Sequence, residues 1–163
     1  MLYLDLFRAL DAHGVNYLLV GGLAMNIHGV PRMTLDIDVV LALDEANLDR
    51  FIACAVSQGL EPVVPVPLAA LKDPAMRRQW AEEKRMIALG LQNRSARVPL
   101  MVDVLIAPPI DLPAALARAK LADLNGVPLR VASIEDMIAL KSGTGRAQDE
   151  SDINHLEQLR DRP

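Results

Sequence analysis

The stretch Tyr17–Leu43, YLLVGGLAMNIHGVPRMTLDIDVVLAL, constrains the fold of this chain more than any other segment. The apolar run Tyr17–Val20 leads into a glycine pair, and a short helical pattern follows over Leu23–His28. The chain then returns, after about fifteen residues, as a strand in which apolar and acidic residues alternate. We therefore expect a strand, a tight turn, a short helix and a second strand that lies close to the first.

Asp36 and Asp38 occupy alternate positions of this second strand, so their carboxylates project from the same face. Their Cα atoms would lie about 6.5 Å apart, two steps of roughly 3.3 Å. Such a pair suits Mg²⁺, which prefers oxygen ligands and completes its shell with water and substrate phosphates. Two such ions would stabilise the attacking and leaving oxygens of a displacement at phosphorus. A solvated strand face is the alternative interpretation.

Gly21 and Gly22 stand between the first strand and the short helix. Backbone amides at such a corner can approach phosphate oxygens closely, because glycine has no side chain in the way. The alternative is a tight strand-to-helix turn without a ligand. The nearby acidic strand favours the phosphate-binding interpretation.

From Gly21 to Asp38 the residues read Gly-Gly-x-Ala-x-x-x-His-Gly-x-x-Arg-x-Thr-x-Asp-x-Asp, which resembles the signature of the nucleotidyltransferase superfamily. The pattern is most similar to the branch with the abortive-infection nucleotidyltransferase toxins of type IV toxin-antitoxin systems. It is also similar to small lincosamide and aminoglycoside nucleotidyltransferases. The resemblance implies an α/β, polymerase beta-like nucleotidyltransferase fold: a small mixed sheet flanked by helices, with a helical C-terminal part. Many members have Gly-Ser at the positions of Gly21 and Gly22, so phosphate contact here would fall to backbone amides and other donors.

Asp103 is the single acid in the apolar segment Val98–Ala107, which reads as a buried strand. A carboxylate in such surroundings is costly to bury unless it is paired or bound to a metal. The resemblance implies that it is a third metal ligand beside Asp36 and Asp38 and the general base for the incoming hydroxyl. An aspartate that faces solvent at a strand end is the alternative.

Lys141 and Arg146 are the lysine and arginine of the segment Ile134–Leu159. This segment also resembles the C-terminal segment of the toxin-like branch. Lys as a point charge and Arg as a bidentate fork can both neutralise a triphosphate. They can equally form ion pairs with Asp149 and Asp152 across the junction of two helices. Both interpretations stay open, and we take the two aspartates as structural.

Arg32 and Thr34 lie between the glycine corner and the acidic strand, as candidates for phosphate or base contact. His28 precedes a glycine, as His13 does, and this pattern is typical of helix C-termini. A catalytic His28 is the alternative. No spacing of histidine or cysteine suggests zinc.

The length of 163 residues and the hydrophobic content of 52% predict one globular domain, 1–163. We divide it into a catalytic core, 1–109, and a C-terminal hairpin with helices, 110–163, after the pair Pro108-Pro109. The charged segment Lys72–Arg85 is either a mobile cover over the acceptor site or a solvated helix anchored by Trp80. The remaining expected elements are helices at Leu2–Ala12 and Asp44–Gln58, a loop or edge strand at Glu61–Pro67, a strand near Arg85–Leu91, a turn at Asn125-Gly126, and helices from Ile134 and from about Gln148.

The net charge of −4 and the aromatic content of 3% argue against a broad nucleic-acid-binding surface or a base-stacking platform. No apolar run is long enough for a membrane span and no secretion signal is apparent, so we expect a cytoplasmic protein that does not bind membranes.

The sequence therefore predicts a Mg²⁺-dependent nucleotidyltransferase that moves a nucleoside monophosphate from an NTP to a hydroxyl acceptor and releases pyrophosphate. Two Mg²⁺ ions are expected with bound NTP. The acceptor is a protein, an RNA or a small molecule, and an antitoxin is a possible protein partner. The alternatives are a non-catalytic nucleotide- or partner-binding module and an antibiotic-modifying enzyme. The expected catalytic and metal-binding residues are Asp36, Asp38 and Asp103, and the expected nucleotide contacts are Gly21, Gly22, Arg32, Thr34, Lys141 and Arg146.

Overall fold

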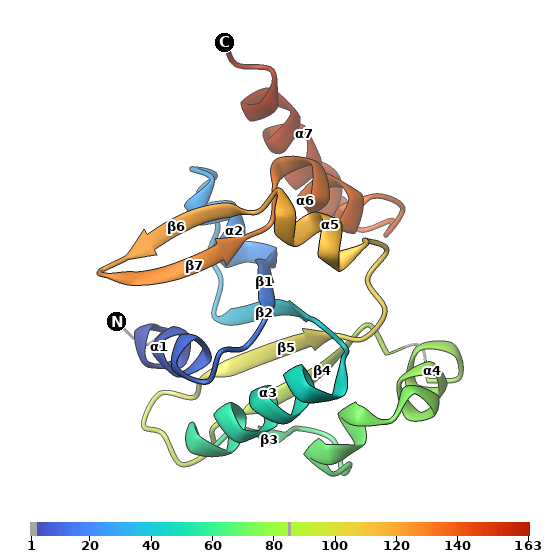
Figure 1. The fold of residues 1–163 in the computed structure, drawn as a ribbon. Coiled ribbons are helices and arrows are strands. Elements are labelled where there is room, and N and C mark those ends of the chain that lie inside the picture. The colour runs from blue at the N-terminus through green and yellow to red at the C-terminus, as the bar shows by residue number, and fades with distance from the viewer. Residues whose placement is uncertain (1–2, 85) are drawn as a thin grey trace.

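The computed structural model describes residues 3–84 and 86–163, whose strands form one seven-stranded mixed sheet (Figure 1). The strands are β1 (Tyr17–Val20), β2 (Asp36–Leu41), β3 (Glu61–Pro62), β4 (Ala88–Gln92), β5 (Met101–Leu105), β6 (Lys120–Leu124) and β7 (Val127–Val131). Their order across the sheet is β3-β4-β5-β2-β1-β7-β6. β1 pairs antiparallel with β2, whereas β2 is parallel to β5 and β1 is parallel to β7. The expected α/β class with a mixed sheet is confirmed.

Burial along the strands follows their place in the sheet. The central strand β1 is buried at all four positions, as expected for a strand covered on both faces. The two-residue strand β3 forms one edge, where a proline costs no inner ladder hydrogen bond. At the other edge, β6 and β7 form a hairpin whose turn residues, Asn125 and Gly126, have φ values of 51° and 82°. The expected turn is confirmed, and the segment expected as a loop or edge strand, Glu61–Pro67, forms an edge strand only at Glu61–Pro62.

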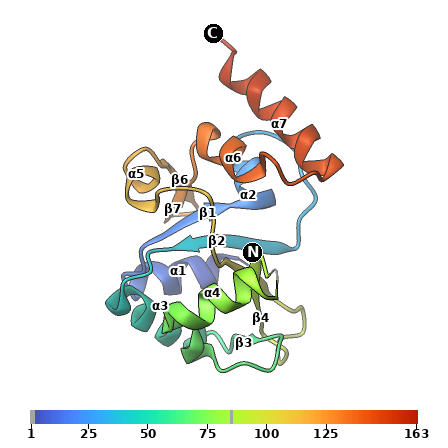
Figure 2. The same ribbon diagram turned by 90° about the vertical axis from the view of Figure 1, so that its right-hand side faces the viewer.

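Helices cover the sheet from two sides. In Figures 1 and 2, α2, α6 and α7 lie above β1 and β2, whereas α1 and α3 lie below them. The apolar core between these layers includes Phe7, Leu18 and Met25. The helices are α1 (Leu4–Ala12), α2 (Gly21–Ile27), α3 (Glu45–Ser57), α4 (Pro74–Glu82), α5 (Leu112–Ala117), α6 (Ile134–Lys141) and α7 (Ala147–Arg160), with a 3-10 turn at Leu68–Lys72.

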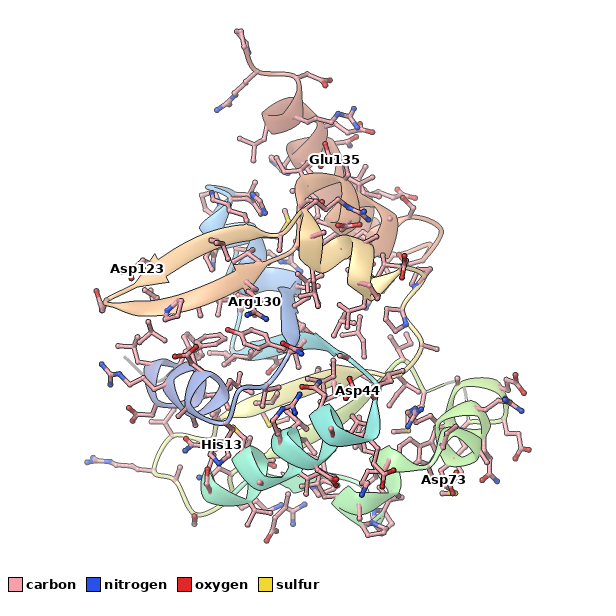
Figure 3. All side chains as sticks on the ribbon, in the orientation of Figure 1. His13, Asp44, Asp73, Asp123, Arg130 and Glu135 are labelled. Atoms are coloured by element: carbon pink, nitrogen blue, oxygen red, sulfur yellow. The ribbon has the colours of Figure 1, made fainter. Side chains whose placement is uncertain are left out.

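Local hydrogen bonds fix several helix starts. The Asp44 carboxylate accepts a 2.9 Å hydrogen bond from the Asn47 amide, and Asp73 accepts one of 2.8 Å from the Ala75 amide. Figure 3 shows both aspartates at the beginnings of α3 and α4. Each satisfies an amide that has no partner inside the helix.

The structure differs from the expected boundaries in a few places. α2 begins at Gly21 and not at Leu23, because the glycine pair forms its first turn. α4 is the anchored helix, since Trp80 is only 1% exposed. Leu2 and Arg85, the expected ends of two elements, lie outside the described residues. Among the described residues, none of the helices combines the length and apolarity needed to cross a bilayer.

Candidate active site

Three aspartates from two neighbouring strands meet on one face of the sheet. β2 and β5 are parallel, and their register places Asp38 directly opposite Asp103. Side chains at paired positions of adjacent strands project to the same face, and Asp36, two residues before Asp38, shares it. All three line one cleft of about 710 Å³. The structure therefore brings together the three acids that the sequence singled out.

The electrostatics of this cluster disfavour three negative charges. Burial raises the pKa of Asp38 to about 6, and repulsion by Asp103 and then by Asp36 adds to this shift. Lys141 and the backbone amide of Gly22 act in the opposite direction on the pKa of Asp38, but they do not cancel it. Burial and the charge of Asp36 also raise the pKa of Asp103. A bound cation would relieve this repulsion.

The donor set of the cluster fits a divalent ion that substrate oxygens help to bind. In residues 3–84 and 86–163, no three carboxylate, histidine or cysteine side chains stand in a ready-made metal cage. Mg²⁺ seldom uses such a cage, because it binds one or two carboxylates and completes its octahedron with water and phosphates. Oxygen ligands alone also favour Mg²⁺ over zinc. Metal binding by Asp36, Asp38 and Asp103 stays a prediction.

The glycine corner allows two close approaches that no other residue permits. Gly21 has a φ of 71°, and a Cβ at this position would overlap the carboxylate of Asp38. A Cβ on Gly22 would lie 2.7 Å from Cβ and 2.9 Å from Oγ1 of Thr34. A serine at position 22 would therefore displace Thr34. Thr34, from the loop after α2, occupies the space that a serine side chain at position 22 would need.

The loop of residues 28–35, between α2 and β2, is held by side-chain contacts with the backbone. The Asn26 side chain makes two hydrogen bonds with the backbone of Arg32. Its Oδ1 accepts from the Arg32 amide at 2.6 Å, and its Nδ2 donates to the Arg32 carbonyl at 2.9 Å. Thr34 Oγ1 donates to the Asp36 carbonyl at 3.1 Å, and the Tyr3 hydroxyl donates to the Thr34 carbonyl at 3.3 Å. Arg32 and Thr34 line the cleft. No pattern in the sequence indicates this role of Asn26.

Lys141 and Arg146 lie in the same cleft and also form ion pairs. Lys141 Nζ is 2.8 Å from Asp152 Oδ2 and 3.4 Å from Asp149 Oδ1, and Arg146 Nε is 2.8 Å from Asp149 Oδ2. Burial would raise the pKa of Asp149, but the Thr144 hydroxyl and these two cations hold it below its ordinary value. The ion-pair interpretation is thus confirmed. Contact with phosphate stays a prediction, and it is compatible with the position of both cations.

His28 has a structural contact. Its Nε2 lies 2.7 Å from the carbonyl oxygen of Ala132, which ties the end of α2 to the residue after β7. His28 is not among the residues that line the acidic cleft. The helix C-terminus interpretation fits this position.

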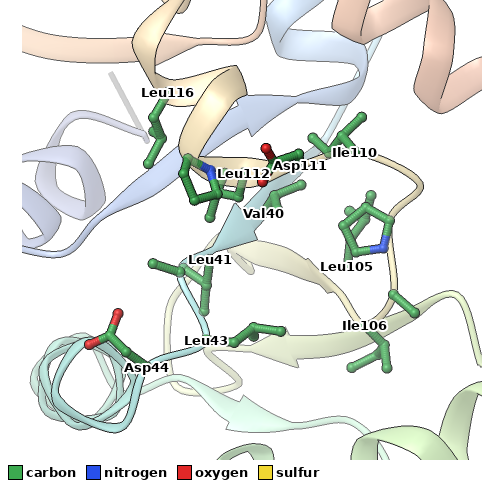
Figure 4. A pocket seen from close by; sticks show the side chains of 14 residues that line it. Val40, Leu41, Leu43, Asp44, Leu105, Ile106, Ile110, Asp111, Leu112 and Leu116 are labelled. Carbon is green, nitrogen blue, oxygen red and sulfur yellow. The ribbon is translucent and has the colours of Figure 1, made fainter.

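A second pocket, of about 550 Å³, lies at the C-terminal ends of β2 and β5, beneath α5 (Figure 4). Aliphatic side chains converge on it from β2, β5 and α5, including Leu41, Leu105 and Leu116. The charged residues that line it are Asp44 and Asp111, both acidic. None of the described residues that line this apolar pocket is a cation that could bind a triphosphate, whereas the cleft with the three aspartates is lined by Arg32, Lys141 and Arg146. That cleft is therefore the candidate site.

The raised pKa of Asp38 gives a pH-dependent stability to the metal-free protein. Because the folded-state pKa is about 6 against 3.8 for the ordinary group, this contribution is present below pH 3.8 and is lost as pH rises through 6. Between pH 5 and 7.5, wild type should lose about 1.4 kcal/mol of unfolding free energy relative to Asp38→Asn. Urea unfolding of both proteins in a chelating buffer measures this difference. A difference that stays constant with pH would contradict the raised pKa.

The chain has a nucleotidyltransferase fold. Its mixed sheet carries acids on two neighbouring strands, and the glycine corner and three cations lie in the same cleft. Residues 4–142 match the family model of the nucleotidyl transferase AbiEii toxin of type IV toxin-antitoxin systems. The match covers most of the chain, and the protein belongs to this family. No curated protein matches the sequence.

Solved structures share the fold at low sequence identity. An antigenic nucleotidyltransferase-like protein from Paracoccidioides brasiliensis is 20% identical, with a TM-score of 0.58 over 94% of this chain and 71% of that one. A putative nucleotidyltransferase from Thermotoga maritima is 15% identical, with a TM-score of 0.56 over 99% and 92% of the chains. ANT(2")-Ia in complex with adenylyl-2"-tobramycin is 15% identical, with a TM-score of 0.52 over 98% and 92%.

Proposed function

We propose that this protein transfers a nucleoside monophosphate from an NTP to a hydroxyl acceptor and releases pyrophosphate. The observation that carries the proposal is the register of β2 and β5, which sets Asp38 opposite Asp103 beside the glycine corner. Acids alone do not indicate a nucleotide. Arg32, Lys141 and Arg146 on the wall of the same cleft supply the charge that a triphosphate needs.

Asp36, Asp38 and Asp103 would hold Mg²⁺, which when bound would neutralise charge on the phosphates and on the attacking oxygen. Asp103 accepts the proton of the acceptor hydroxyl, a role that suits a carboxylate whose pKa is raised by burial. The acceptor oxygen forms a bond to the α-phosphorus as the bond from that phosphorus to the β-phosphate oxygen breaks. Pyrophosphate leaves with the electron pair of the broken bond.

Three cations that line the cleft would bind the β- and γ-phosphates, which leave as pyrophosphate. Lys141, which already lowers the pKa of Asp38 through its charge, can reach the triphosphate together with Arg146 and Arg32. Gly21 lines the cleft, so its backbone can approach a phosphate, whereas the amide of Gly22 already faces Asp38. Thr34 adds a hydroxyl beside the corner.

The biological role that we propose follows the family: the transfer acts as the toxin of a type IV toxin-antitoxin pair, and an antitoxin opposes it. A small-molecule acceptor is the second candidate. It is favoured by the fold shared with ANT(2")-Ia, whose solved complex contains an adenylylated tobramycin. The expected cytoplasmic location stays a prediction.

Label transfer tests the proposal and ranks the acceptors. The protein is incubated with Mg²⁺, a cell extract and each NTP labelled at the α-phosphate. We expect label in one acceptor class, separated as RNA, protein or small molecule, and one pyrophosphate released for each label transferred. The reaction should stop with a chelator, because the ions neutralise the reacting phosphate. Absence of label with all four NTPs would contradict an active transferase, and nucleotide binding without transfer would favour the non-catalytic module.

A further inference from the structure

We propose that Asn26, near the end of α2, is a positioning residue that holds Arg32 in the cleft for the triphosphate. This inference rests on the proposed function and deepens it, because it assigns a role to a residue that does not line the cleft. Asn26 acts through the backbone of Arg32, so its own side chain need not touch the nucleotide.

The Asn26 side chain clamps the backbone of Arg32 at two points. One amide side chain makes both hydrogen bonds of one backbone unit, at 2.6 Å to the amide and 2.9 Å to the carbonyl. Both distances lie within or below the usual range of protein hydrogen bonds. Together they satisfy the backbone amide and carbonyl of Arg32, which have no neighbouring strand in this part of the described structure. They also fix the backbone position from which the Arg32 side chain projects.

The guanidinium of Arg32 is poorly satisfied by the protein. Its Nη1 lies 3.8 Å from Asp152 Oδ1, which is too long for a hydrogen bond. Its Nε is buried and has no hydrogen-bond partner among the described residues. The Arg32 side chain is only 28% exposed. A buried cationic donor without an acceptor is costly, and a bound anion in the adjoining cleft would satisfy it.

The other end of the loop is held independently of Asn26. The contacts of Thr34 with Asp36 and Tyr3, described above, do not involve Arg32. Loss of the Asn26 side chain should therefore release Arg32 while the Thr34 end stays in place. Alanine also has a higher helix propensity than asparagine, so Asn26→Ala should not unwind α2.

The first test is nucleotide binding by the full chain, measured by calorimetry with Mg²⁺ and a non-hydrolysable NTP. Asn26→Ala should weaken binding about tenfold, as expected when a charge-assisted contact is lost. In an Arg32→Ala background, the same change should weaken binding less than about twofold, because the guanidinium group that Asn26 positions is absent. Asn154→Ala, at an exposed position of α7, is the matched control and should bind as wild type does. Equal effects of Asn26→Ala in both backgrounds would overturn the proposal.

The second test needs no nucleotide. Hydrogen exchange at the Arg32 amide should become at least about tenfold faster in Asn26→Ala, because the amide loses its acceptor, while amides of β5 keep their protection. Unchanged exchange at Arg32 with normal nucleotide binding would overturn the role of Asn26 and leave the proposed function intact. Faster exchange in a protein whose wild type binds no NTP would overturn the proposed function, and with it the triphosphate role, while it confirms the clamp.

Discussion

Asp38→Asn is expected to lower the rate of nucleotide transfer by at least about a thousandfold and to leave the folded protein as stable as before or more stable. The substitution removes one charge from the metal-binding cluster and hardly changes the volume. The same charge is repelled in the metal-free protein, where burial and two neighbouring acids raise the pKa of Asp38 to about 6. Removing it should stabilise the protein by at most about 3 kcal/mol at neutral pH.

The opposite directions of these effects make the prediction specific. Transfer is measured with labelled NTP, and stability by urea unfolding without metal. Asp5→Asn is the control, since Asp5 is 82% exposed on α1 and far in sequence from the cluster. It should leave transfer unchanged and lower the free energy of unfolding by less than about 1 kcal/mol, because Asp5 forms only an exposed ion pair with Arg8. Transfer that survives in Asp38→Asn would exclude this carboxylate from the reaction, and a large loss of stability would show that its role is structural.

The second large effect is on stability. Lys141→Met should lower the free energy of unfolding by about 3 to 5 kcal/mol, because it leaves two carboxylates in the protein interior without their shared cation. The side chains of Asp149 and Asp152 are only 8% and 3% exposed, and that of Lys141 is 12% exposed. Nucleotide affinity should fall as well, but the stability loss is measurable without any ligand, by urea unfolding at neutral pH.

Arg146→Ala is the matched control for this prediction. Arg146 contacts Asp149 at 2.8 Å, yet its side chain is 65% exposed, and ion pairs of exposed side chains contribute about 0 to 1 kcal/mol. We therefore expect a loss below about 1 kcal/mol for Arg146→Ala. If Lys141→Met lost no more than Arg146→Ala, the two aspartates would not depend on Lys141.

The part of the site that could be predicted from the sequence is the part with a short-range pattern. The alternation of Asp36 and Asp38 with apolar residues predicts a shared face without knowledge of the sheet. The pairing of Asp38 with Asp103 does not follow from any local pattern, because the two residues belong to strands far apart in the sequence. The resemblance to a known family supplied that expectation, and the strand register places the two residues opposite each other.

Contacts that depend on the path of a loop could not be predicted. Asn26 reads as an ordinary helix residue until the 28–35 loop folds back and places the Arg32 backbone beside it. The presence of glycine and not serine at position 22 likewise has a reason only once Thr34 occupies the space above it. For Lys141 the sequence left two partners open, phosphate and aspartate, because spacing alone does not tell a buried ion pair from a free cation.

The most direct test of the central claim is a crystal structure of the protein with Mn²⁺ and a non-hydrolysable NTP. The anomalous signal of Mn²⁺ locates the metal independently of the protein coordinates. We expect a peak bound by oxygens of Asp36, Asp38 and the triphosphate, with Asp103 beside it and the phosphates next to Lys141. A triphosphate bound elsewhere, or a metal peak remote from the three aspartates, would contradict the account.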